Sequence, residues 1–123
     1  MSPPDCCESG HCPAAVVLRL LGSELKLLVM HSLMTQGRRF NDLRERSGIC
    51  QSSLARTLRE LEALGIADRV VHPEERPVGV EYRLTPMGED LSRAIEEFER
   101  WTERWTRELE ARLGHPLVTP SPR

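Results

Sequence analysis

The sequence has no hydrophobic run long enough to cross a membrane and no recognisable targeting segment. Its longest apolar run, Ala14–Leu18, is far shorter than the roughly 20 residues that a helix needs to span a bilayer. The N-terminal segment Met1–Asp5 lacks the basic and apolar regions of a signal peptide. These absences exclude an integral membrane protein, and we expect a cytoplasmic protein that has no membrane partner.

Lysine is nearly absent, and the net charge is small. Lys26 is the single lysine among 17 basic residues, and the remaining arginines suit bidentate contacts to phosphate and guanine, although a GC-rich genome gives the same bias. The formal net charge of −2 argues against a strongly basic nucleic-acid binder. The charge is uneven, however, because residues 36–85 carry 9 basic and 8 acidic side chains and residues 86–113 carry 5 and 8. The local charge at a contact face matters more than the total.

A disulfide framework is also missing, because only four cysteines occur in a chain that we expect to be cytosolic. Three of them lie close to the N-terminus, where Cys6, Cys7, His11 and Cys12 offer soft metal ligands. Their spacing matches no common zinc pattern, and adjacent cysteines fit poorly around one tetrahedral ion. We therefore assign no metal ligands and no cofactor, and a metal-responsive regulator that uses this cluster remains an alternative, as do inert thiols.

With 123 residues the chain is sufficient for one small domain, which we expect over residues 14–113. A flexible cysteine-rich arm (1–13) should precede it, and a disordered tail (114–123) should follow it. Hydrophobic periodicity predicts five helices and two strands. The expected helices cover residues 14–21, 24–35, 40–47, 51–64 and 86–113, and the expected strands cover residues 66–72 and 78–84. The apolar side of the second helix should consist of Leu25, Leu28, Val29 and Met34.

The ends of these elements carry recognisable signals. Ser47-Gly48 predicts the turn between two helices, and Gly65 is well placed to end the helix over 51–64. Thr85-Pro86 is typical of a helix start. The order of short helix, turn, second helix and two strands around a charged loop is that of a winged helix-turn-helix. The sequence therefore predicts a mainly α fold with a small β-hairpin wing.

In this fold the second helix of the pair enters a DNA major groove. The inward face of the helix over 51–64 consists of leucines at helical spacing, namely Leu54, Leu58, Leu61 and Leu64. Base contacts should come from the opposite face, and phosphate contacts from arginines around it. The expected DNA-binding residues are Gln51, Ser52, Ser53, Arg56 and Arg59 on this helix, and Arg38, Arg39, Arg44 and Arg76 elsewhere. A solvated amphipathic helix is the alternative for this segment alone.

The terminal helix contains a second pattern, a heptad-like apolar seam that includes both tryptophans. Such a seam is costly on the surface of a monomer. Packing against the chain's own first helix is one interpretation, and a homodimer interface shared with residues 14–35 is the one that we favour. The expected interface residues are Leu91, Ile95, Phe98, Trp101, Trp105 and Leu109.

Residues 12–91 resemble the HxlR family of bacterial transcription regulators. The shared motifs are Cys12-Pro13, Leu21-Gly22, Arg39-Phe40-x-x-Leu43, the leucine-rich helix, Gly65-Ile66, Arg69, and Val80-Glu81-Tyr82-x-Leu84-Thr85-x-x-Gly88. The chain departs from the family pattern where a lysine and a tryptophan are replaced by Glu24 and Leu25, and where Cys50 replaces a serine.

The resemblance implies a homodimeric repressor or activator that binds double-stranded DNA at a palindromic promoter site. It also implies that Cys12 senses oxidants or electrophiles, as the cysteine at that position does in several members. Cys50 should lie at a helix N-terminus, which favours thiolate, although it also fits as a poor replacement for a serine cap. A protein–protein adaptor with the same fold is the rival function. A thiol-peroxidase-like or metal-dependent enzyme is disfavoured, because no second catalytic group accompanies the cysteines.

Overall fold

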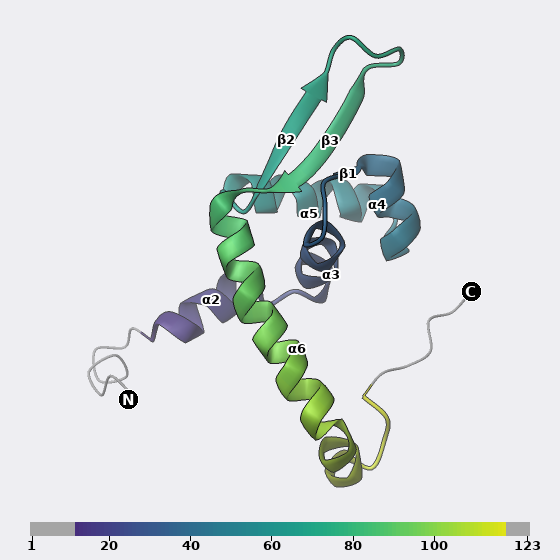
Figure 1. Ribbon diagram of the computed structural model, residues 1–123. Helices are drawn as coiled ribbons and strands as arrows, with labels where there is room; N and C mark the ends of the chain where they lie inside the picture. The colour runs from purple at the N-terminus through teal and green to yellow at the C-terminus, as the bar shows by residue number, and fades with distance from the viewer. Residues whose placement is uncertain (1–11, 118–123) are drawn as a thin grey trace. The chain divides into compact units, whose positions relative to one another are not determined.

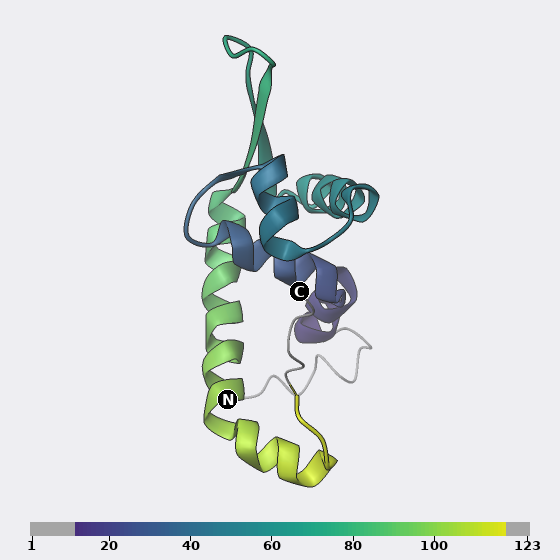
Figure 2. The ribbon, with the colours of Figure 1, turned by 90° about the vertical axis from the view of Figure 1, so that its right-hand side faces the viewer.

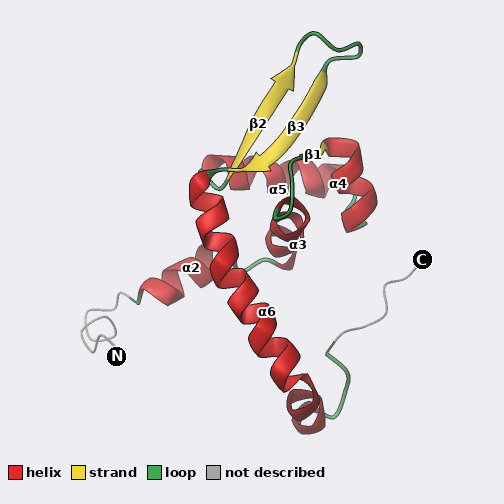
Figure 3. Ribbon diagram, viewed as in Figure 1, coloured by secondary structure: helices red, strands yellow, loops and turns green. Residues whose placement is uncertain are grey.

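The computed structural model describes residues 12–117, which divide into two compact units. The first unit ends at Glu89 and the second begins at Asp90. Helices predominate, and a three-stranded antiparallel sheet completes the first unit (Figure 3). The expected fold class, mainly α with a small β-hairpin wing, is therefore confirmed. Most of the arm expected at 1–13 and of the tail expected at 114–123 lies outside the described residues.

The helices and strands follow the expected order. The first unit contains α2 (Pro13–Leu21), α3 (Glu24–Leu33), β1 (Arg38–Arg39), α4 (Phe40–Ser47), α5 (Gln51–Ala63), β2 (Ala67–His72) and β3 (Gly79–Leu84), and α6 (Pro86–Leu113) begins there and forms most of the second unit. Most boundaries agree with the expected ones to within one residue. Helix α3 is shorter than expected, because Met34 is its C-cap, and strand β1 was not expected.

The core of the first unit forms where α3, α4 and α5 pack together. Its fully buried side chains come from all three helices and include Val29, Met30, Leu43, Leu54, Leu58 and Leu61. The leucine face predicted for α5 is thus buried, except that Leu64 is only partly so. The apolar side predicted for the second helix was wrong at Leu28, which is exposed, because the buried side of α3 consists of Val29, Met30 and Leu33.

Strands β2 and β3 form an antiparallel hairpin that extends beyond α4 and α5 (Figures 1 and 2). We call residues 67–84, the two strands and their connecting loop, the wing. Strand β1 adds a third strand beside β3, with Arg39 opposite Glu81. Because Glu81 also lies opposite Val70 on β2, the sheet order is β1-β3-β2. The short β1 therefore joins the start of α4 directly to the wing.

Thr85 and Gly88 join the base of the wing to the start of α6. The Thr85 hydroxyl donates to the Gly65 carbonyl at 2.5 Å and accepts from the Gly88 N–H at 3.0 Å, so it caps the helix and holds the preceding turn. A side chain at Gly88 would collide with the Ile66 carbonyl. The spacing Thr85-x-x-Gly88 thus combines a helix cap with a close backbone approach.

Candidate nucleic-acid interface

Helix α5 presents a polar surface because its other face is fixed in the core. Thr57 is buried beside the leucines, and its hydroxyl donates to the Ser53 carbonyl at 2.8 Å. Thr57 was not among the residues expected on the inner face, although its spacing from Leu54 and Leu58 places it there. Of the expected base-reading residues, Gln51, Ser52, Arg56 and Arg59 are exposed and Ser53 is partly exposed. The structure therefore brings these five together on the outer side of one rigid helix.

The turn before α5 is set by Gly48, which adopts a left-handed conformation (φ 71°) at the end of α4. Buried Ile49 follows and anchors the turn. Cys50 is then the N-cap of α5, as expected, although its side chain makes no capping hydrogen bond to the backbone. The thiol is exposed at the start of the surface described above.

Hydroxyl groups around the Cys50 thiol favour its ionised form. The Cys50 sulfur lies 3.3 Å from Ser53 Oγ and 3.7 Å from Ser52 Oγ. Hydrogen bonding with Ser53, first through its side chain and then through its backbone, lowers the pKa of Cys50 to about 7. A thiol with a lowered pKa supplies a nucleophilic thiolate at neutral pH. The interface thus contains a group whose charge changes near physiological pH.

The arginines expected to contact phosphate lie in different environments. Arg38 is largely enclosed, with a 9% exposed side chain that donates to the Ser32 carbonyl at 2.7 Å and to Asp42 at 3.0 Å. Arg44 is exposed on α4. The Arg76 guanidinium folds back on the loop of the wing, where it donates to the Pro73 carbonyl at 2.7 Å.

Arg39 is exposed but already engaged by the wing. Its two terminal nitrogens donate hydrogen bonds to the two oxygens of Glu75, at 2.7 and 2.9 Å. Arginine binds phosphate in the same bidentate way. The Arg39 guanidinium lowers the pKa of Glu75 below its usual value, and Glu75 in turn raises that of Arg39. The candidate interface is therefore not uniformly basic, because a carboxylate of the wing competes for this arginine.

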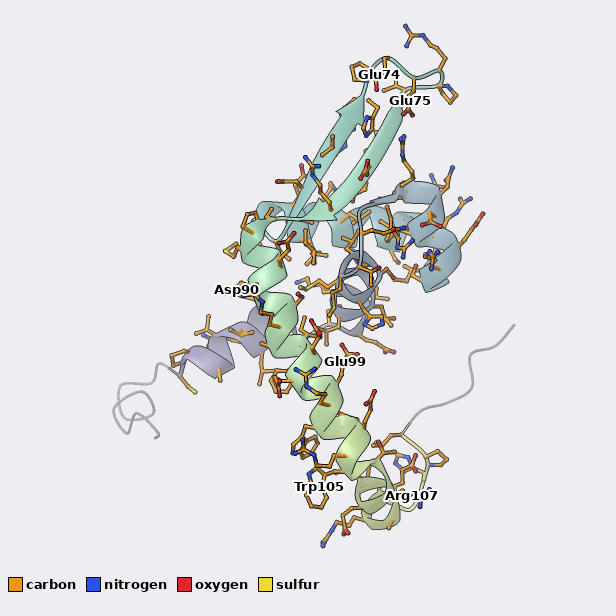
Figure 4. The ribbon with its side chains drawn as sticks, in the orientation of Figure 1. Glu74, Glu75, Asp90, Glu99, Trp105 and Arg107 are labelled. Atoms are coloured by element: carbon orange, nitrogen blue, oxygen red, sulfur yellow. The ribbon has the colours of Figure 1, made fainter. Side chains whose placement is uncertain are left out.

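Helix α6 carries the residues that we expect to form an apolar seam. Three of its aromatic side chains are exposed, namely Phe98 (67%), Trp101 (50%) and Trp105 (45%), whereas Leu91, Ile95 and Leu109 are half-buried. Figure 4 shows Trp105 projecting from the helix. Elsewhere on α6, Arg112 forms an exposed ion pair with Glu108. Among the described residues, no helix is both long and apolar enough to cross a membrane.

Cys12 is the N-cap of α2, and its side chain is partly exposed. Its carbonyl accepts the first hydrogen bond of the helix, from Val16 N–H at 3.0 Å. The other members of the N-terminal cluster, Cys6, Cys7 and His11, lie outside the described residues, so the alternative of a metal site there stays a hypothesis.

Helices α4 and α5 form a helix-turn-helix pair, α5 has a polar outer surface, and the hairpin of β2 and β3 adjoins them. Together these features define a winged helix-turn-helix regulator. The chain belongs to the HxlR-like helix-turn-helix family, whose sequence pattern matches residues 20–110. It is 36% identical to the HTH-type transcriptional regulator YtfH of Escherichia coli K12 over 93 residues, which are 75% of this chain and 73% of that protein. It is 38% identical to YodB of Bacillus subtilis over 87 residues, or 70% of this chain and 77% of that protein.

Solved structures show the same likeness. Reduced YodB from B. subtilis has a TM-score of 0.68 and 36% identity, covering 76% of this chain and 93% of that one. The redox regulator HypR in its reduced form has a TM-score of 0.75 and 33% identity, covering 81% of this chain and 99% of that one. The protein is therefore a DNA-binding transcriptional regulator of the helix-turn-helix type, and its family consists of regulators rather than enzymes.

Proposed function

We propose that this regulator binds a palindromic promoter site as a homodimer, with the N-terminal half of α5 in the major groove. The observation that carries the proposal is the exposure of Gln51, Ser52 and Arg56 on a helix whose opposite face is buried. Serine and glutamine can donate to or accept from base edges, and arginine binds guanine O6 and N7. A cytoplasmic location stays a prediction that accords with this function.

The arginines expected to contact phosphate fall into two groups, according to whether the guanidinium is available or enclosed. Arg44 on α4 and Arg76 in the loop of the wing supply positive charge, and Arg39 joins them when it exchanges Glu75 for a phosphate. We place Arg38 differently, as a positioning residue, because its guanidinium is occupied by Ser32 and Asp42.

Dimerisation is proposed through the exposed aromatic seam of α6. Phe98, Trp101 and Trp105 would leave a large apolar surface in water on a monomer, and burial of such surface stabilises association. A two-fold dimer also matches a palindromic site, because its two recognition helices meet half-sites about 34 Å apart.

Cys12 is the proposed sensor of oxidants or electrophiles. Its thiol is partly exposed, and the residue is the N-cap of α2. The chain resembles HypR, described as a redox regulator, and YodB, whose structure was also solved after diamide treatment. A disulfide formed by Cys12 and a second thiol, with diamide accepting the two electrons and two protons, would reorient α2.

A gel shift with the chain's own upstream DNA tests the proposal against the adaptor alternative. We expect a discrete complex that a scrambled duplex of equal length does not compete away. An adaptor would bind both duplexes equally weakly. Diamide should then change the affinity of the wild type and of Cys50→Ser, but not of Cys12→Ser. Loss of the response in Cys50→Ser alone would instead assign sensing to the thiol at the start of α5. An equal response in the wild type and Cys12→Ser would reject Cys12 as the sensor.

A further inference from the structure

The loop of the wing brings together three side chains of the types that bind metal ions. His72, Glu74 and Glu75 each place a ligand atom within 4.8 Å of the others. They come from a single tight turn, because the Glu75 N–H donates to the His72 carbonyl at 3.2 Å. Pro73 occupies the position of that turn where proline's fixed φ is favoured. Figure 4 shows Glu74 and Glu75 together at this end of the wing.

We propose that these three side chains bind a divalent cation of the zinc type. Zinc bonds to imidazole nitrogen and carboxylate oxygen are about 2.0–2.2 Å long, which separates neighbouring ligands of a tetrahedral ion by about 3.4 Å. His72 Nδ1 lies 3.5 Å from Glu74 Oε1, close to that separation. One imidazole with two carboxylates suits zinc better than magnesium or calcium, which prefer oxygen alone. A fourth position would be open to water.

Glu81 orients the imidazole for this role. His72 Nε2 lies 3.1 Å from Glu81 Oε1. In the tautomer that carries its proton on Nε2, the imidazole donates to Glu81 and the lone pair of Nδ1 is available to a metal ion. A carboxylate that accepts from the second nitrogen of a ligating histidine is a recurrent support of zinc sites. The two residues share a face of the hairpin, because Glu81 lies opposite Val70, two residues before His72.

Arg39 competes with the cation for Glu75. Both oxygens of Glu75 are bound by the Arg39 guanidinium, and this ion pair occupies the space where a side chain at Gly79 would lie. A cation must therefore take one Glu75 oxygen from the arginine. Bound zinc would weaken the Arg39–Glu75 pair and leave the guanidinium available for another anion.

The test measures zinc binding without DNA, so it does not depend on the proposed function. The full chain with its four cysteines replaced by serine is titrated with zinc against a chromophoric chelator, which removes thiolate ligation as a competing source. We expect one zinc per chain, and at least a tenfold loss of affinity in His72→Ala and in Glu74→Gln. Glu45→Gln, an exposed charge change on α4, is the matched control and should leave binding unchanged.

Arg39 supplies a sharper criterion. Arg39→Ala should tighten zinc binding, since it frees Glu75, and should do so more than Arg107→Ala, which removes an equal charge from an exposed position on α6. Equal zinc binding by the starting protein, His72→Ala and Glu74→Gln would overturn the proposal, as would equal effects of the two arginine variants. Circular dichroism confirms folding, and Glu74→Gln, on an exposed turn residue, decides the result if His72→Ala is unfolded.

Discussion

Arg39 and Glu75 are 36 residues apart in the sequence, yet their side chains meet in two hydrogen bonds of 2.7 and 2.9 Å. The pair connects the start of α4 to the loop of the wing, and both side chains remain substantially exposed. Arg39 lowers the pKa of Glu75, which extends the pH range of the ionised carboxylate further into acid. The pair is present above the usual glutamate pKa and is lost only when the pH falls through the lowered value.

Glu75→Gln should strengthen binding to DNA of any sequence. The substitution removes a negative charge near the phosphates and releases Arg39, so the dependence of log K on log salt should steepen by about one phosphate contact. Fluorescence anisotropy over a salt series measures both effects. Glu108→Gln on α6 is the matched charge control. An equal change in the two variants would mean that only net charge matters.

Arg56→Ala should weaken specific binding by roughly 1–3 kcal/mol, or about 5- to 150-fold, because we propose that its exposed guanidinium on α5 contacts a base. Competition with scrambled DNA separates the specific loss from the general one. Arg107→Ala on α6 removes the same charge outside the interface. Unchanged specificity in Arg56→Ala would remove this side chain from base reading.

Cys50 should react with iodoacetamide with a rate that rises through pH 7. Below the pKa of about 7 the thiol is neutral and slow, and above it the thiolate fraction saturates. Ser53→Ala removes the main hydrogen bond and should move the midpoint to higher pH. Peptide mass spectrometry resolves Cys50 from the other cysteines. A midpoint near the ordinary thiol value of about 8.5 in both proteins would contradict this.

Trp101→Asp combined with Trp105→Asp should convert a dimer into a monomer or an aggregate, because a carboxylate cannot be desolvated cheaply in an apolar interface. Sedimentation velocity measures the outcome. Arg104→Asp introduces a carboxylate on the same helix between the two tryptophans without removing an aromatic ring. A normal dimer in the double variant would refute the proposed interface.

Gly88→Ala should destabilise the fold by about 1–3 kcal/mol, since the added methyl group collides with the Ile66 carbonyl, which is backbone and cannot rotate away. Urea denaturation measures the free energy of unfolding. Met87→Ala, at the neighbouring exposed position, serves as the control. Equal stability of Gly88→Ala and the wild type would show that the turn can shift.

The sequence predicted the helices because their signals are local. Leucines at helical spacing in α5, a glycine at its end, and Thr85-Pro86 before α6 each act within a few residues, and each of these elements is present. Strand β1 escaped prediction because two residues have no periodicity, and they become a strand only by pairing with β3. Leu28 was misplaced because neighbouring apolar residues on α3 left the buried side ambiguous.

The sequence by itself determined the winged helix-turn-helix class and the order of its parts, since periodicity and turn residues act over short distances. Only the tertiary structure decided the state of each charged group. Arg38 and Arg39 are adjacent and identical in the sequence, but one is enclosed by Ser32 and Asp42 and the other is held by Glu75. The contacts of Arg38 are local, because Asp42 lies one helical turn further along the chain. The contact of Arg39 depends on the long-range pairing of β1 with β3, and no local pattern relates Arg39 to Glu75.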